Sequence, residues 1–191
     1  MFQRESCDTY SVTGPKAGRL AAEHLLDLGH TRVAHISGPL SLHLARERLA
    51  GFRQAFEARG LTAGLCATGE GHWECAEGYQ AMQHILAGSG CPTAVFAAND
   101  RMAIGAMRAI AEAGLCVPQD ISIVGLDDIE VAAFQTPPLT TVRQSFTQMA
   151  RLGVELLFNV LAGTPPAQPH VVLEPVLIVR QSTAPPCRRA R

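Results

Sequence analysis

PTAVFAANDRMAIGAMRAIAEAGLCVPQDISIVGLDD, residues 92–128, contains two short apolar runs separated by a longer segment with helical spacing. The runs TAVFA (93–97) and ISIVGL (121–126) are typical of strands that are buried on both faces. Between them, Asn99 is a favoured first residue for a helix, which the spacing of apolar residues predicts over 101–113. Two buried strands joined by one helix form a βαβ unit, and this unit predicts a parallel sheet.

The same alternation of strands and helices continues on both sides of this stretch. Helices are predicted where apolar residues recur at helical spacing, over 16–28, 42–59, 76–87, 129–134 and 146–161. Further strands are predicted at short apolar runs, over 33–36, 139–142, 171–173 and 176–179. The fold class is therefore expected to be α/β, with a largely parallel sheet and helices on both of its faces.

The composition excludes several classes of protein. The chain has 191 residues, of which 47% are hydrophobic and 17% are charged, so it can bury a sizeable core and is too apolar to be disordered. A formal charge of -1 gives no overall attraction to nucleic acid or to anionic lipid. No apolar run is long enough to cross a bilayer, and Arg4, Glu5 and Asp8 stand where a signal peptide needs apolar residues. We therefore expect a cytoplasmic chain without a membrane partner.

Sequence motifs for catalysis and for metal binding are missing. The six cysteines form no C-x-x-C pair and lack zinc-ligand spacing, so reduced thiols are predicted. No G-x-S-x-G elbow, phosphate-binding P-loop or H-E-x-x-H helix occurs. The chain is accordingly not expected to be an enzyme, and no catalytic residue, metal or cofactor is predicted.

Polar side chains gather where predicted strands end, which is the edge at which open parallel sheets bind ligands. These residues, with the only tryptophan in a nearby loop, are Arg46, Arg48, Trp73, Asn99, Asp100, Asp127, Asp128, Arg143 and Gln144. Guanidinium, carboxylate and amide groups can bond adjacent hydroxyls, and an indole can cover an apolar ring face. This set of groups suits a polyol.

Most of these residues also have a purely structural role open to them. Asn99 and Asp100 can cap the helix that follows, which is the favoured role for Asp100, and Asp128 can cap the short helix after it. One of Arg46 and Arg48 can be a solvated charge on a helix surface. The tryptophan can simply anchor its loop in the core.

Six segments occur in an order and spacing that is specific: LAAEHLLDLGHTRVAHISGPL, ARERLAGFRQAFEARGL, GYQAMQHIL, residues 92–128, PPLTTVRQSF and LEPVLIVRQST. The series resembles the effector-binding core of LacI/GalR-type bacterial transcriptional repressors, with most likeness to the lac repressor branch. The resemblance implies a periplasmic-binding-protein-like pair of α/β lobes that closes on a small molecule, as the sugar-sensing part of a regulator. The matching positions imply an effector site made of Arg48, Trp73, Asn99, Asp127, Gln144 and Phe146.

The resemblance also implies how the chain is divided. It predicts a remnant of the N-terminal lobe (1–38 with 143–165), a complete C-terminal lobe (39–142 with 166–183) and a tail (184–191). Hydrophobic faces of the remnant are expected to be uncovered, which predicts marginal stability or self-association.

Partners follow from the same resemblance. A saccharide or related small molecule is the implied effector, and a homodimer is implied through the C-terminal lobe, where 101–113 is expected to be apolar all round. Operator DNA is expected to be bound only through a helix-turn-helix, which this sequence lacks. A transport-type sugar-binding protein of the same fold remains an alternative, and an enzyme on a doubly wound fold is a weaker one.

Overall fold

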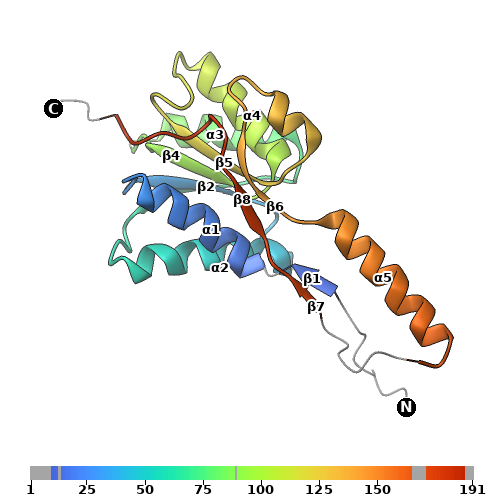
Figure 1. Ribbon diagram of the computed structural model, residues 1–191. Coiled ribbons are helices and arrows are strands. Elements are labelled where there is room, and N and C mark those ends of the chain that lie inside the picture. The colour runs from blue at the N-terminus through green and yellow to red at the C-terminus, as the bar shows by residue number, and fades with distance from the viewer. Residues whose placement is uncertain (1–9, 13, 89, 165–170, 188–191) are drawn as a thin grey trace.

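The computed structural model describes residues 10–12, 14–88, 90–164 and 171–187, and it has the predicted α/β fold. Six strands form the main sheet in the order β3-β2-β4-β5-β6-β8 (Figure 1). Their bounds are β2 Val33–Ser37, β3 Leu65–Glu70, β4 Ala94–Ala97, β5 Ser122–Asp127, β6 Thr140–Arg143 and β8 Val176–Ile178. All neighbouring pairs are parallel except β6 and β8, which run antiparallel.

Five α-helices and one 3-10 helix complete the main elements of the described residues. Their bounds are α1 Gly14–Asp27, α2 His43–Ala58, α3 Cys75–Ala87, α4 Asp100–Glu112, η1 Glu130–Phe134 and α5 Phe146–Leu161. Two further strands, β1 Tyr10–Val12 and β7 Val171–Leu173, pair in parallel as a separate small sheet. In Figure 1, α1 and α2 lie on one face of the main sheet and α3 and α4 lie on the other.

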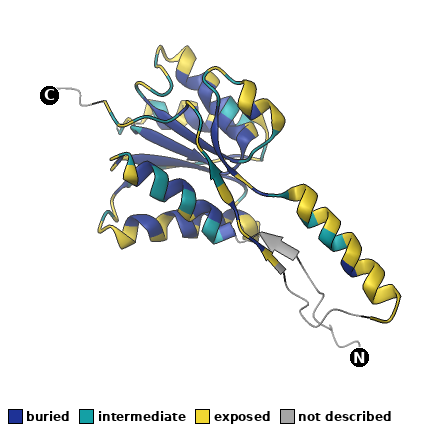
Figure 2. Ribbon diagram, viewed as in Figure 1, coloured by how far each residue is buried: buried dark blue, intermediate teal, exposed yellow. Residues whose placement is uncertain are grey.

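The central strands β4 and β5 of the main sheet are buried on both faces, as their apolar runs predict (Figure 2). Val95 of β4 packs with Met102 and Ile110 of α4, whereas the next residue, Phe96, packs with Phe52 of α2 on the opposite side. Successive side chains of a strand point to opposite faces, so one short strand serves two cores.

Helix α4 departs from the expectation of apolar residues all round. Six of its apolar residues are buried within this domain: Met102, Ala103, Ala106, Met107, Ala109 and Ile110. Its outer side carries the exposed Arg101, Arg108 and Glu112. The helix is therefore amphipathic, because α3 and the sheet already cover its apolar side.

The predicted boundary at residue 38 does not coincide with a division of the structure. The segment 14–37, assigned from the sequence to the N-terminal remnant, forms α1 and β2 of the main layered body. Strand β2 pairs with both β3 and β4, since all five of its residues are buried and need neighbours on each side. Helix α5 and the small sheet instead extend away from this body (Figure 1).

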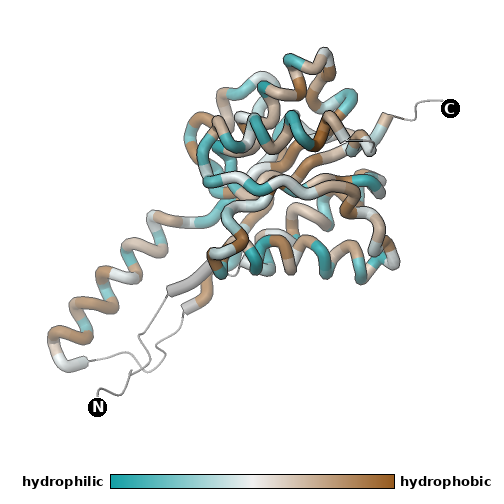
Figure 3. The backbone as a smooth tube through the Cα atoms, turned by 180° about the vertical axis from the view of Figure 1, so that it is seen from behind, coloured by the Kyte–Doolittle hydropathy of each residue, from teal (hydrophilic) through white to brown (hydrophobic). Residues whose placement is uncertain are grey.

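Helix α5 exposes a set of large apolar side chains, in agreement with the expectation of uncovered hydrophobic surface. They are Phe146, Val154, Leu157, Phe158, Val160 and Leu161. Figure 3 shows this helix projecting from the body with hydrophobic residues along its length. None of the helices in the described ranges combines the length and the hydropathy needed to span a membrane.

Two helical glycines provide a matched test of helix packing. Gly51 of α2 faces α1 so closely that a Cβ there would lie 1.9 Å from the carbonyl oxygen of Pro15. Gly153 of α5 has no neighbour within 4 Å of such an atom. We expect Gly51→Ala to lower the free energy of unfolding by about 3 kcal/mol, because the backbone of α1 must move away from the added methyl group. Gly153→Ala should raise it by about 1 kcal/mol through helix propensity. Urea unfolding of both variants checks this, and equal effects would contradict the close α1–α2 contact.

Candidate ligand-binding site

A pocket of about 580 Å³ lies at the carboxyl ends of the main-sheet strands. Its walls are formed by His43, Leu44, Glu47, Arg48, Trp73, Asn99, Asp127, Gln144, Phe146 and Met149. The structure thus brings together all six residues that the sequence analysis selects. They come from five separate segments, with Gln144 and Phe146 on the same one, because parallel strands deliver their following loops to one edge.

Arg48 is the most buried charged side chain of the pocket, at 4% exposed. Its Nη1 donates to the carbonyl oxygen of Ala98 at 2.5 Å, and its Nη2 lies 3.9 Å from Oδ1 of Asp127. The guanidinium also stands 5.4 Å from the centre of the Trp73 ring, at cation–π distance. Burial lowers the pKa of Arg48, and the nearby Asp127 partly offsets this effect.

One donor of Arg48 is left over. Its Nε is buried and has no hydrogen-bond partner among the described residues. A buried donor without a partner costs about 1–3 kcal/mol, so such groups call for an explanation. The Nε atom itself is closed off from solvent, so Arg48 lines the pocket with its other atoms.

Trp73 forms one wall of the pocket from the loop between β3 and α3. Its backbone has a φ of 74°, and its ring lies directly on Gly38. A Cβ on Gly38 would lie 2.0 Å from Cη2 of the indole, so only glycine lets the ring approach the end of β2. Trp73 therefore anchors its loop and lines the pocket at the same time.

Asn99 caps α4, which was one of its two predicted roles. Its Oδ1 accepts from the backbone N–H of Met102 at 2.9 Å, and its Nδ2 donates to the carbonyl oxygen of Trp73 at 2.8 Å. The amide thereby ties the tryptophan loop to the start of α4. One amide hydrogen and one oxygen lone pair remain for a ligand.

Asp127 is the last residue of β5 and has an unusual backbone and an unusual acidity. Its φ of 118° is rare for a residue with a side chain, and such conformations cost about 1–3 kcal/mol. Gln144 Nε2 donates to its Oδ1 at 2.9 Å. Burial raises the pKa of Asp127 to about 7, with Asp100 adding to the rise while Arg48 and Gln144 oppose it. The carboxyl group is therefore close to half-ionised at neutral pH.

The part of the pocket lining that belongs to α5 is apolar and partly exposed. Phe146, at the start of α5, is 49% exposed, and Met149 lies one turn later. Four lining residues were not predicted from the sequence: His43, Leu44, Glu47 and Met149. The helical spacing reveals the two apolar ones. Leu44 precedes Arg48 by four residues and Met149 follows Phe146 by three, so each pair shares one helix face.

Among the remaining strand-end residues, Arg46 is the solvated helix charge that was predicted for one of the two arginines. Its exposed guanidinium donates from Nη1 to the carbonyl oxygens of Leu40 and Ser41, each at 2.7 Å. It is not among the pocket-lining side chains of the described residues. Arg46 is thus an exposed neighbour of Arg48 on the same helix.

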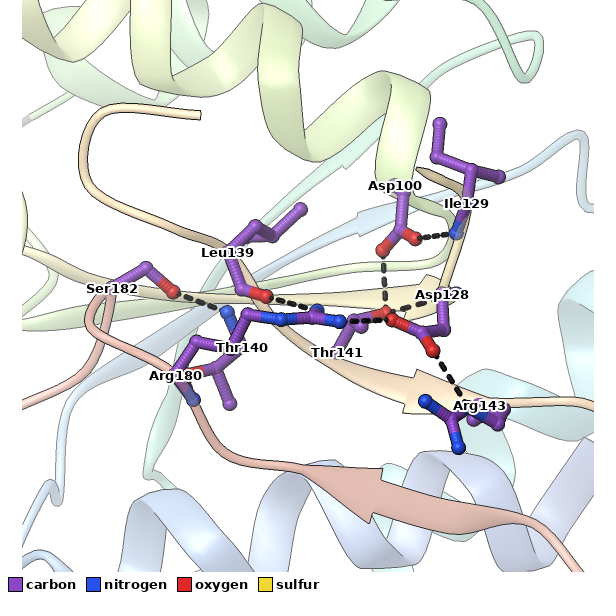
Figure 4. Close-up of polar contacts among 9 residues, drawn as sticks. All are labelled: Asp100, Asp128, Ile129, Leu139, Thr140, Thr141, Arg143, Arg180 and Ser182. Carbon is purple, nitrogen blue, oxygen red and sulfur yellow. Dashed lines mark hydrogen bonds and ion pairs between the residues drawn. The ribbon is translucent and has the colours of Figure 1, made fainter. Parts of the chain in front are cut away.

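The capping roles predicted for Asp100 and Asp128 are wrong. Asp100 is fully buried and accepts from Thr141 Oγ1 at 2.5 Å and from the backbone N–H of Ile129 at 2.9 Å. Asp128 instead forms ion pairs with Arg143 and Arg180, each at 2.6 Å (Figure 4). The partners of the two carboxylates lie on β6 and on the segments that follow β5 and β8, and neither carboxylate caps the helix next to it.

No metal centre is found in the described ranges, since no group of three His, Cys, Asp or Glu side chains there can hold an ion. The groups that converge in the pocket are a buried guanidinium, two carboxyls, two amides, an imidazole and the aromatic rings of Trp73 and Phe146. Together they can donate to and accept from several hydroxyls while contacting an apolar ring face.

Residues 22–183 match the protein family described as "Periplasmic binding protein-like domain". The chain belongs to this family. In this periplasmic-binding-protein-like domain the pocket lies at the strand ends from which β2, β4, β5 and β6 continue into loops and helices.

Relatives of the domain are named as transcriptional repressors. The ribose operon repressor of Escherichia coli (strain K12) is 42% identical over 167 residues, which cover 86% of this chain and 50% of that protein. The repressor PurR of Pasteurella multocida (strain Pm70) is 40% identical over 167 residues, covering 87% and 50%. A solved dimeric lac repressor superposes with a TM-score of 0.88 at 38% identity, covering 93% of this chain and 64% of that one.

These matches confirm the resemblance to LacI-type repressors that the ordered sequence segments predict. The chain spans about half the length of the curated relatives that it matches. The relatives named above are repressors rather than enzymes.

Proposed function

We propose that this chain is the effector-binding core of a LacI-type transcriptional regulator and that its pocket binds a saccharide. One observation carries the proposal: six residues chosen from the sequence line a single pocket at the strand ends. The names of the ribose operon repressor and the lac repressor, both carbohydrate-related, support a sugar over other small molecules.

The chemistry of binding follows from the groups present. The Arg48 guanidinium donates to a hydroxyl oxygen of the sugar, and the Asp127 carboxylate accepts from a neighbouring hydroxyl. Gln144, already bonded to Asp127, holds that carboxylate in place. Trp73 and Phe146 contact the apolar face of the sugar ring from the pocket walls.

In the whole regulator, the effector would act by binding two arrangements of the protein with different affinities. Such a difference shifts the equilibrium between the arrangements and thereby changes the affinity for DNA. The chain as given contains no helix-turn-helix, so we expect no sequence-specific operator binding from it alone. The repressor relatives favour a cytoplasmic regulator over a transport-type binding protein.

Calorimetric titration of the chain with D-ribose, D-galactose, D-glucose and cellobiose tests the proposal, with adenine as a ligand of a different class. We expect saturable binding of at least one saccharide and none of adenine. Adenine binding without any saccharide binding would contradict the assignment of ligand class. A titration without heat for all five compounds would contradict the proposed function.

We also propose that η1 lies in a homodimer interface. Phe134 and Val131 of η1 are 77% and 50% exposed. Adjacent large apolar side chains on a surface often mark a contact with another protein. Phe134→Glu should therefore increase the dissociation constant of the dimer by about tenfold or more, measured by sedimentation. Phe158→Glu on α5, where Phe158 is 66% exposed, is the matched control. Dissociation by the α5 variant alone would place self-association on α5 instead.

A further inference from the structure

Asp100 and Asp128 stand next to the pocket carboxylate Asp127, yet neither belongs to the pocket lining formed by the described residues. Their contacts join the end of β5 to α4, to β6 and to the segment after β8 (Figure 4). We call this group the turn cluster; it consists of Asp100, Asp128, Thr141, Arg143 and Arg180 around the turn that follows Asp127.

In the outer part of the cluster, two arginines form ion pairs with the side chain of Asp128. Arg143 Nε donates to its Oδ2 and Arg180 Nη2 donates to its Oδ1, both at 2.6 Å. Burial favours the neutral acid, but the two arginines outweigh it and lower the pKa of Asp128. Arg180 is itself fixed, because its Nη1 donates to the carbonyl oxygen of Leu139 at 2.8 Å and its backbone N–H donates to Thr140 Oγ1 at 2.9 Å.

The inner part of the cluster holds the backbone that follows Asp127. Thr141 Oγ1 donates to Asp100 and accepts from the backbone N–H of Asp128 at 3.4 Å. The other oxygen of Asp100 accepts from the backbone N–H of Ile129 at 2.9 Å. The two amides after Asp127 are thus both bound to side chains from other elements.

The backbone held in this way is strained. Asp127 and Asp128 have φ values of 118° and 58°, in the left-handed half of conformational space that favours glycine. Such conformations persist only when the surrounding structure determines them, and they concentrate at functional sites. Here the turn directs Asp127 toward Gln144 at 2.9 Å and Arg48 at 3.9 Å.

We propose that Asp128, gripped by Arg143 and Arg180, is a positioning residue that holds the Asp127 carboxylate in the pocket without contacting the ligand. The proposal rests on the saccharide-binding function proposed above. Arg180, in the segment after β8, thereby affects ligand binding through Asp128. That segment contributes no side chain to the pocket lining among the described residues.

The test uses two substitutions that preserve charge or shape. Arg180→Lys keeps the positive charge but cannot hold Leu139 and Asp128 with two fixed donors. Thr141→Val removes only the hydroxyl that links Asp100 to the turn. Arg59→Lys is the control, because Arg59 forms a 2.6 Å pair with Asp27 at the far end of α2 from the pocket.

Two measurements separate positioning from a general loss of stability. The first is the titration of the Asp127 carboxyl by ¹³C NMR in the ligand-free chain, where we expect the midpoint to shift by roughly half a pH unit in both variants. The second is calorimetry with D-ribose, where we expect affinity to fall between about threefold and tenfold. The Arg59→Lys control should change neither quantity.

The outcomes separate this inference from the proposed function. If neither variant moves the Asp127 titration relative to the control, the positioning role is overturned. An unchanged affinity for D-ribose, in variants of a chain that binds it, also overturns the role. If the titration moves while the unmodified chain does not bind D-ribose, the positioning role is supported and only that choice of sugar fails.

Discussion

Arg48→Ala is expected to weaken saccharide binding by between about tenfold and a hundredfold while the chain still unfolds cooperatively. The loss of one charged hydrogen-bond partner costs about 1.5–3 kcal/mol, which corresponds to that change in affinity. The residue is buried and lines the pocket, so its removal deletes a ligand contact rather than a surface charge. Calorimetry with the saccharide that binds most tightly measures the effect.

Arg46→Ala is the matched control for this experiment. Arg46 lies two residues earlier on α2, carries the same charge, and bonds only to exposed backbone carbonyls of Leu40 and Ser41. Its replacement should change the affinity by less than about twofold. Equal losses from both variants would mean that net positive charge, and not a specific contact of Arg48, attracts the ligand.

Asp127→Asn is expected to stabilise the chain at pH 8 and to have no such effect near pH 4. The folded-state pKa of Asp127 is raised from 3.8 to about 7, mainly by burial. Between those values the folded chain binds a proton that the unfolded chain has released, so stability falls as the pH rises through this window. Above pH 7, ionisation of the buried Asp127 lowers the free energy of unfolding by on the order of 4 kcal/mol. Asparagine does not ionise, so the variant avoids this loss.

Urea unfolding of the unmodified chain and the variant at pH 4 and pH 8 measures this difference. Asp27→Asn serves as the control, since Asp27 is 65% exposed and lies at the end of α1. We expect the advantage of Asp127→Asn to grow steadily with pH while Asp27→Asn shows none. A constant difference at both pH values would show that Asp127 is ionised throughout and that its burial has little energetic effect.

The same ionisation affects binding in the opposite direction. A carboxylate accepts hydrogen bonds from two hydroxyls, whereas the protonated acid has one donor and less acceptor capacity. Saccharide affinity should therefore increase about tenfold between pH 6 and pH 8 in the unmodified chain. It should be weak and independent of pH in Asp127→Asn. An affinity of the unmodified chain that stays flat across this range would exclude the Asp127 carboxylate from the contact.

Sequence reasoning located the pocket because one rule of parallel sheets places distant residues at a common edge. Arg48, Asn99 and Asp127 are far apart in the chain, yet each follows or ends a strand whose carboxyl end faces the pocket. The helices and most strands were predicted within a residue or two, since their apolar spacing is strong. Strand β3 was missed because LCATGE has no apolar run and lies at a partly exposed edge.

The errors concern partners that are remote in sequence. Asp128 binds Arg180, which is 52 residues away, and Asp100 binds Thr141, which is 41 residues away. A cap within three residues is the obvious local choice for either carboxylate, and only the register of β5, β6 and β8 reveals the alternative. The boundary at residue 38 failed for a similar reason, because the apolar pattern of β2 does not say which strands flank it.

The central claim is that Arg48, Trp73 and Asp127 contact one bound saccharide, and an NMR titration tests it directly. Trp73 is the only tryptophan, so its indole N–H gives a single signal, and the buried Nε–H of Arg48 gives another. Both signals should shift on addition of the saccharide and saturate with the same dissociation constant. Saturable shifts confined to other residues, with these two signals unmoved, would contradict the claim.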